Sequence, residues 1–184
     1  MACEAERWTE ATTLALESFG EEIFSYLIAS TRSEADASEI YSMFCENLWK
    51  GLRRFRWESS FRTWAYVLAR HAWSHFARDP NRRRGRRVPL SEPEVERIAA
   101  DVRSRTITLL RTEMKDRLTE LRDQLAADDR SLLILRVDRK LSWSDIAAIV
   151  GEDEDDAAAR TRRAATLRKR FERIKADLRA KLRA

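Results

Sequence analysis

The sequence has few of the residues that interrupt helices, with only four glycines and three prolines among 184 residues. All three prolines lie between Asp79 and Pro93, so long stretches on either side contain none. The rest of the chain is rich in Ala, Leu, Glu and Arg, which favour helices. This composition predicts an all-α protein.

Cysteine and long apolar runs are also scarce. The two cysteines, Cys3 and Cys45, do not have the spacing of metal ligands, and we expect both to be reduced thiols. No apolar run approaches the roughly 20 residues needed to cross a bilayer, and the N-terminus lacks a basic-then-apolar signal. We therefore expect a cytoplasmic protein with no membrane insertion, no metal site and no cofactor.

Charge is segregated along the chain, although the net charge is only +5. Residues 50–87 carry 12 basic and 2 acidic side chains, and residues 158–184 carry 11 and 2. Acidic side chains predominate in residues 1–49 and 88–157. A single basic block would be typical of a solvated helix face. Two separate basic blocks favour two contacts with a polyanion, and nucleic acid is the polyanion we expect.

Helical spacing of apolar residues divides the chain into two parts. It extends from Trp8 to Ala77, with a break after which Ser33 is a candidate helix cap. The stretch "DPNRRRGRRVPLSEP", residues 79–93, cannot continue a helix and predicts a linker. We predict two small helical domains, residues 1–79 and 106–184, joined by a linker of residues 80–105. Whether residues 94–127 are a mobile linker or a packed helix stays open at this point.

Residues 140–174, "KLSWSDIAAIVGEDEDDAAARTRRAATLRKRFERI", have the pattern of a helix-turn-helix. Ser142 is a candidate N-cap for its first helix, with Asp145 three residues later. The second helix has an apolar stripe and is otherwise crowded with Arg and Lys, so it could lie in a major groove. The acidic run 152–156 would repel phosphate, so the groove contacts should begin at Arg160. A simple αα-hairpin with a basic surface is the alternative.

Both parts together resemble the sigma-70 family of bacterial RNA polymerase sigma factors, in its extracytoplasmic-function (ECF) group. The N-terminal motifs are a D-A-x-D-like Asp36–Glu39, then Trp49, Arg54-Phe55, "SSFRTW" at 59–64 and Ala69-Arg70. The C-terminal motif is L-S-x-x-E-I-A-x-x-L-G, which corresponds to residues 141–151, followed by Arg160 and Arg163-Ala164.

The resemblance implies a sigma factor that performs no chemistry. It would bind core RNA polymerase, direct it to specific promoters and help to open their −10 region. Residues 36–54 would bind the clamp helices of the β′ subunit, and the β flap is a further implied contact. The polymerase-binding residues would be Asp36, Glu39, Ile40, Met43 and Asn47. The family's Gln–acid pair in this helix is Ser42-Met43 here. The resemblance leaves open an anti-sigma factor as an additional partner.

Promoter DNA is the second implied partner. Residues 59–78 would bind and open the −10 element through Arg62, Tyr66, Arg70, His71 and Trp73. The helix-turn-helix would bind the −35 element through Arg160, Arg162 and Arg163. A helical wheel centred on Phe61 favours core packing for Phe61 and Trp64. It turns Tyr66 and Trp73 outward, where their rings could stack on unpaired bases. His75, where the family has Asp, falls toward the core side of the same wheel.

Other classes of protein fit less of the sequence. An enzyme is disfavoured because the chain has two histidines, no Gly-rich phosphate loop and no nucleophile–base signature. A helix-turn-helix regulator that does not bind core polymerase would leave "SSFRTW" and the first basic block unexplained. A helical adaptor would leave the charge segregation unexplained.

Overall fold

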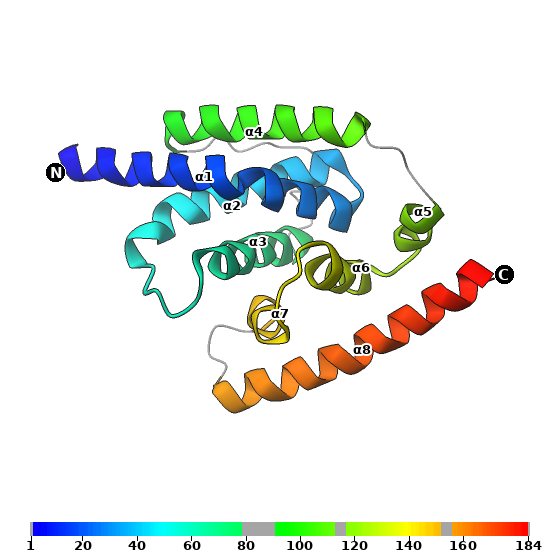
Figure 1. Ribbon diagram of the computed structural model, residues 1–184. Coiled ribbons are helices and arrows are strands. Elements are labelled where there is room, and N and C mark those ends of the chain that lie inside the picture. The colour runs from blue at the N-terminus through cyan, green and yellow to red at the C-terminus, as the bar shows by residue number, and fades with distance from the viewer. Residues whose placement is uncertain (1, 79–90, 113–116, 152–155, 184) are drawn as a thin grey trace. The chain divides into compact units, whose positions relative to one another are not determined.

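The computed structural model describes residues 2–78, 91–112, 117–151 and 156–183, and within these ranges it contains helices and no strand (Figure 1). The all-α fold expected from the sequence is confirmed. The chain divides into two compact units, Met1–Glu113 and Met114–Ala184. Among the described residues, none of the helices is long and apolar enough to span a membrane.

The described residues of the first unit form four α-helices and one short 3₁₀ turn. They are α1 (Ala2–Thr31), α2 (Glu34–Gly51), η1 (Leu52–Arg54), α3 (Phe61–Arg78) and α4 (Pro93–Thr112). Aromatic side chains from α1, α2 and α3 fill its centre, and the largest that are fully buried are Tyr26, Tyr41, Tyr66, Phe24 and Phe44. The core therefore depends on tyrosine rings as well as on aliphatic side chains.

Serine caps fix the beginnings of two of these helices. Ser33 Oγ accepts a 3.1 Å hydrogen bond from the Asp36 amide, which confirms the cap expected for α2. Ser60 Oγ accepts a 3.0 Å hydrogen bond from the Thr63 amide and caps α3 in the same way. The two caps set where the helices start and therefore which side chains face the core.

The boundary between the two parts of the chain differs from the one we expected. The expected linker of residues 80–105 includes most of α4, which is a regular helix packed on α1 and α2. The apolar stripe of α4 is buried at Val95, Ile98 and Val102. Burial of this stripe joins α4 to the first unit, so that unit ends near residue 113.

The second unit contains the helix-turn-helix. Its elements are α5 (Arg117–Asp123), α6 (Ala127–Leu133), a π-helical turn η3 (Ile134–Asp138), α7 (Trp143–Ile149) and α8 (Ala157–Arg183). The guanidinium of Arg130 is buried and donates to the carbonyls of Asp123 and Leu125, at 3.2 and 3.1 Å. These bonds satisfy carbonyls at and just beyond the end of α5 and hold α5 against α6.

Candidate nucleic-acid interface

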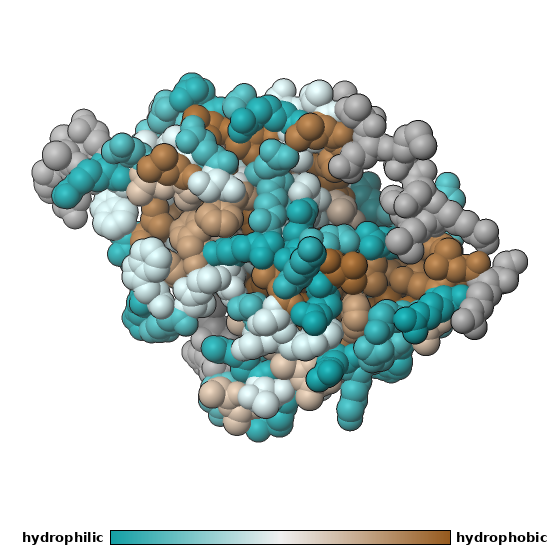
Figure 2. Space-filling model, in the orientation of Figure 1, coloured by the Kyte–Doolittle hydropathy of each residue, from teal (hydrophilic) through white to brown (hydrophobic). Residues whose placement is uncertain are grey.

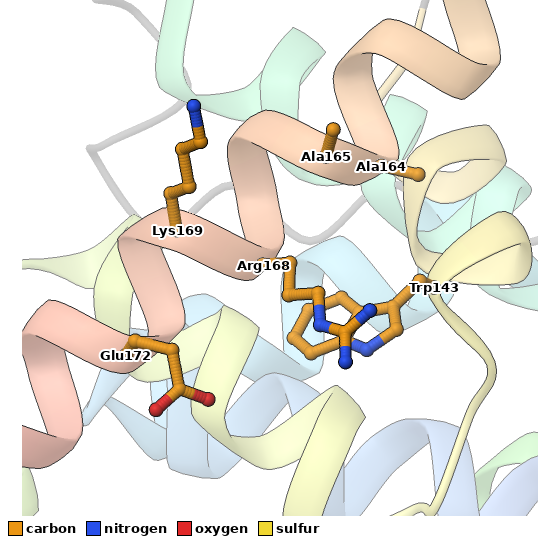
Figure 3. Close-up of a pocket in the computed structure, with 6 residues that line it drawn as sticks. All are labelled: Trp143, Ala164, Ala165, Arg168, Lys169 and Glu172. Atoms are coloured by element: carbon orange, nitrogen blue, oxygen red, sulfur yellow. The ribbon is translucent and has the colours of Figure 1, made fainter.

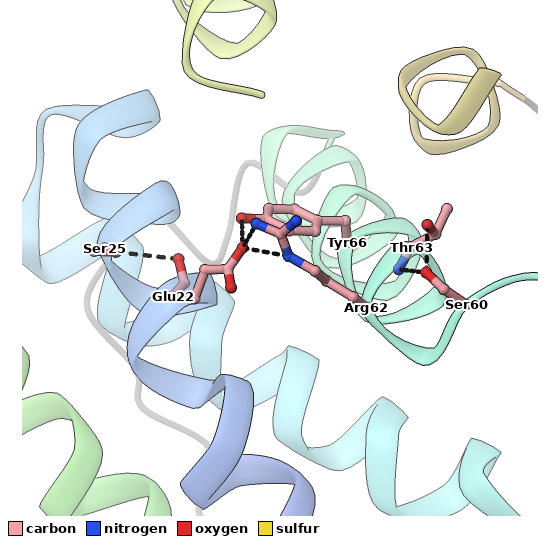
Figure 4. A network of polar contacts seen from close by, with 6 residues as sticks. All are labelled: Glu22, Ser25, Ser60, Arg62, Thr63 and Tyr66. Atoms are coloured by element: carbon pink, nitrogen blue, oxygen red, sulfur yellow. Dashed lines mark hydrogen bonds and ion pairs between the residues drawn. The ribbon is translucent and has the colours of Figure 1, made fainter. Parts of the chain in front are cut away.

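The first turns of α3 are tied to α1 by a single carboxylate (Figure 4). Glu22 Oε1 accepts hydrogen bonds from Arg62 Nε at 2.8 Å and from Arg62 Nη2 at 2.5 Å. The hydroxyl of Tyr66 donates to the same oxygen at 2.8 Å. Figure 4 shows both side chains of α3 pointing toward Glu22. The contact neutralises Arg62 within the unit and fixes the rotation of α3 about its axis.

Tyr66 is therefore in the core, and its expected outward orientation is wrong. Its exposed fraction is 0%, and its ring packs edge-on against Tyr26 at 5.2 Å between centroids. Phe61 and Trp64, expected in the core, are half-buried, and their rings pack against Phe55 at 5.8 and 4.7 Å between centroids. The wheel failed for Tyr66 because α3 packs on α1 as well as on α2, so the buried side is rotated away from the direction of Phe61.

The later turns of α3 keep three of the expected residues near the surface. Trp73 is half-buried, with its ring edge-on to Tyr26 at 6.5 Å. The guanidinium of Arg70 lies 4.9 Å from the centre of the Trp73 ring, a cation–π distance. His71 is also half-buried. His75, which the wheel placed toward the core, is exposed.

The loop before α3 presents a ring that the sequence analysis did not select. Trp57 is 78% exposed, and its backbone has a φ of 61°, which is uncommon for a bulky residue. Its ring lies 4.8 Å from Phe55, and the basic residues Arg54 and Arg56 near it in sequence are exposed. An exposed indole beside guanidinium groups has the chemistry that binds unpaired bases and their phosphates.

In the second unit, α7 and α8 pack against each other as the sequence predicts. Ser142 Oγ accepts a 3.1 Å hydrogen bond from the Asp145 amide, which confirms the cap of α7. Trp143 of α7 packs edge-on against Phe171 of α8 at 5.4 Å. The stripe of α8 that faces this contact is buried at Leu167, Phe171, Ile174 and Leu178. Charged side chains predominate on the rest of α8, and hydrophilic side chains lie along it in Figure 2.

The first turns of α8 carry the three arginines expected at the −35 element. Arg160 and Arg162 are exposed, and Arg163 is half-buried. Asp156 caps the helix, because its Oδ1 accepts a 2.6 Å hydrogen bond from the Ala159 amide. The remaining acidic residues of the run, 152–155, lie outside the described residues. The cap shows that at least one carboxylate of this run serves the helix terminus.

A hollow lies beside these turns, between α7 and α8 (Figure 3). Its lining residues are Trp143, Ala164, Ala165, Arg168, Lys169 and Glu172. Its one acidic side chain, Glu172, pairs with Lys175 at 2.9 Å. Within the described part of the chain, no group of three or more His, Cys, Asp or Glu side chains could hold a metal ion. We interpret the hollow as a crevice between two packed helices.

The expected polymerase-binding residues of α2 divide into surface and core. Asp36, Glu39 and Met43 are half-buried, and Asn47 is exposed. These four residues are called the α2 stripe below. Ile40 is fully buried in the first unit, so the expectation that it forms part of the surface is wrong. The position of Ile40 along α2 is compatible with both the α2 stripe and the core. Packing against the other helices places it in the core.

Part of the first unit is similar to known proteins. Residues 16–84 match the family model of sigma-70 region 2, and this range contains α2, α3 and the second half of α1. This part of the chain is similar to the sigma-70 family. The match and the relative described next support the resemblance to an ECF sigma factor that the sequence suggested. RNA polymerase sigma factor YlaC of Bacillus subtilis (strain 168) is 27% identical over 139 residues, which cover 71% of this chain and 74% of that protein. The comparison with solved structures found no match.

Two residues are important in the structure although no motif in the sequence pointed to them. Glu22 lies 44 positions before Tyr66, and no local pattern connects the two. Arg103 is buried although it belongs to a charged helix. A partial signal for Arg103 exists, since it directly follows Val102 at the edge of the apolar stripe of α4.

Proposed function

We propose that this sigma factor binds core RNA polymerase through α2 and brings it to promoters whose −10 and −35 elements it contacts with separate units. The observation that carries this proposal is the match of residues 16–84 to sigma-70 region 2, followed along the chain by a helix-turn-helix with a basic second helix. The protein performs no chemistry in this scheme, because the polymerase does it. We place it in the cytoplasm, where the polymerase is.

The polymerase contact is assigned to the α2 stripe. Asp36 and Glu39 supply carboxylates near the start of α2, and Met43 and Asn47 continue along the helix. A helix with such a stripe suits a partner that is itself helical, as the clamp helices of the family's polymerase are. The β flap is assigned to the second unit on the resemblance alone. An anti-sigma factor is a further partner on the same basis.

The −10 contact is assigned to α3 and the loop before it. Arg70, His71 and Trp73 remain near the surface, and Trp57 adds an exposed ring. Rings that stack only on unpaired bases stabilise the open strand selectively, at about 1–3 kcal/mol for each base. Selective binding of the open state shifts the equilibrium toward melted DNA without ATP. Tyr66 and Arg62 of α3 bond to Glu22 of α1 and so hold α3 in place beneath this surface.

The −35 contact is assigned to the first turns of α8. Arg160, Arg162 and Arg163 project near the helix terminus that Asp156 caps. Arginines there can contact phosphates or guanine edges in a major groove. Arg170, farther along α8, is not assigned to DNA. Its Nε pairs with Asp129 of α6 at 2.5 Å, and this pair holds α8 against α6.

Run-off transcription with core polymerase and fragmented genomic DNA tests the proposal. We expect discrete transcripts that require the protein. Charge reversal of Asp36 and Glu39 together should abolish both core binding in a titration and transcript formation. Charge reversal of Asp101 and Glu94, exposed on α4, is the matched control and should leave both intact. Sequence-specific DNA binding without core binding would instead identify a helix-turn-helix regulator.

A further inference from the structure

α4 covers the part of α2 where the family has its clamp-binding Gln–acid pair. That pair is Ser42-Met43 in this chain, and Ser42 is only 5% exposed. The residue over it is Arg103 of α4, whose Nη1 donates a 3.2 Å hydrogen bond to Ser42 Oγ. We propose that α4 is an intramolecular competitor of the polymerase clamp, which must leave α2 before this part of α2 can bind polymerase. The inference rests on the proposed function.

The contact between Arg103 and α2 is buried and involves several groups. The guanidinium is buried, with 3% of the residue exposed, and its Nη2 pairs with Glu96 Oε1 of the same helix at 2.8 Å. It also lies 5.9 Å from the centre of the Tyr41 ring. The short side chain of Ser42 leaves room for this group, whereas a Gln at position 42 would extend into the same space. The departure from the family's residue and the buried arginine are therefore complementary.

Two further contacts hold α4 along the unit. At its apolar stripe, Val102 lies over Gly20 of α1, where an added Cβ would be 3.2 Å from Val102 Cγ1. Before its first turn, the amide of Ser91 donates to Glu46 of α2 at 3.1 Å, and the Ser91 hydroxyl donates to the same carboxylate. Figure 1 shows α4 running along α1 on the side away from α3. The segment thus contacts α2 at Ser42 and Glu46, which are next in sequence to Met43 and Asn47 of the α2 stripe.

The ring-to-ring contacts at the centre of the first unit are made without α4. Tyr26 packs on Tyr66, and Phe24 and Phe44 pack on Tyr41, all within α1, α2 and α3. The pair Arg103–Glu96 adds little net stability, because Arg103 is desolvated while Glu96 is 31% exposed. In this proposal another helical partner replaces α4 on α2. Only molecules in which α4 is released bind polymerase at this part of α2. The apparent affinity for polymerase is therefore lower than the intrinsic affinity, in proportion to the released fraction.

Titration of the labelled full-length protein with core polymerase tests this, with hydrogen exchange of the α4 amides as the measure of release. Val102→Asp removes the apolar contact and Arg103→Ala removes the contact with Ser42. Arg105→Ala is the matched control, because Arg105 forms an exposed pair with Asp101 on the same helix. Leu109→Asp is the second control, since Leu109 is already half exposed.

We expect Val102→Asp and Arg103→Ala to speed exchange in α4 and to bind polymerase about tenfold more tightly than the wild type or more. A released state populated at about 10% or less gives this factor. The controls should match the wild type in both measurements. The competitor assignment is overturned if the two variants release α4 but bind polymerase equally well or more weakly, which would make α4 a brace. If the wild type and all variants fail to bind core polymerase, the proposed function itself is wrong.

Discussion

The hydroxyl of Tyr66 donates a 2.8 Å hydrogen bond to Glu22 Oε1, and this bond orients α3 on α1. Arg62 donates to the same oxygen, so one carboxylate fixes two side chains of the helix assigned to the −10 element. The contact has a functional consequence. Residues of α3 that turn toward Glu22 stabilise the unit, and only those on its other sides are available to DNA.

Substitution of Tyr66 should therefore change stability and have no separate effect on promoter opening. Tyr66→Phe loses a hydrogen bond to a charged group, worth about 1.5–3 kcal/mol in the free energy of unfolding. Tyr66→Ala should cost about 3–5 kcal/mol, as for other buried rings. Urea unfolding measures these losses, and permanganate footprinting measures opening for each folded molecule. Normal stability together with impaired promoter opening would contradict this prediction and indicate that Tyr66 contacts DNA.

Gly20 should not tolerate a side chain. A Cβ at Gly20 would lie 2.5 Å from Tyr41 Oη and 3.2 Å from Val102 Cγ1, so Gly20→Ala should destabilise the protein by about 1–3 kcal/mol. Tyr41→Phe removes the closer of the two atoms and should restore part of the loss in the double variant. A double-mutant cycle of thermal melts measures this coupling. Additive effects would show that another contact limits the space at Gly20.

The arginines of the first turns of α8 should govern the salt dependence of −35 binding. Each lost phosphate contact lowers the slope of log K against log salt by about 0.9, and each lost base contact costs about 1–3 kcal/mol and relaxes specificity. Alanine at Arg160, Arg162 and Arg163 together should therefore lower both affinity and slope in a fluorescence anisotropy titration.

Alanine at Arg173, Arg179 and Lys181 is the matched control for this measurement. These residues carry the same charge and are exposed near the other end of α8. The control should keep specificity for the −35 sequence, because its residues lie away from the helix start. If the two triple variants behave alike, α8 contributes only general attraction to DNA.

Stability should fall in alkaline solution because of two buried groups of α2. Burial raises the pKa of Cys45, and burial likewise raises the pKa of Tyr41 well above its ordinary value. In the unfolded chain these groups ionise at their ordinary values, about 8.5 and 10, whereas the folded state keeps them neutral. Their contribution is therefore complete below about pH 8 and is lost as the pH rises, by up to about 1.4 kcal/mol per unit for each group.

Urea unfolding from pH 7 to pH 10 measures this loss. Cys45→Ala should flatten the first part of the decline, because Tyr41 is then the one of these two groups that still titrates differently in the two states. Whatever packing the substitution removes lowers stability equally at every pH and does not alter the slope. An unchanged slope in the variant would show that other groups cause the decline.

Several features of the structure follow from the sequence because they are local. The caps at Ser33 and Ser142 need only a hydroxyl three residues before a free amide. The buried stripe of α8 from Leu167 to Leu178 needs only the helical repeat. The helical class of both parts was determined in the same way, by composition and by patterns contiguous in sequence.

Tertiary structure alone decided which sides of α3 and α4 are buried. Tyr66 is oriented by Glu22, 44 positions away, and Arg103 is bound by Ser42, 61 positions away. Periodicity shows that a helix has an apolar side, but a tyrosine or an arginine can satisfy its polar group either in water or on a buried partner. Which of these occurs depends on whether folding brings an acceptor within about 3 Å, and no local pattern encodes that distance.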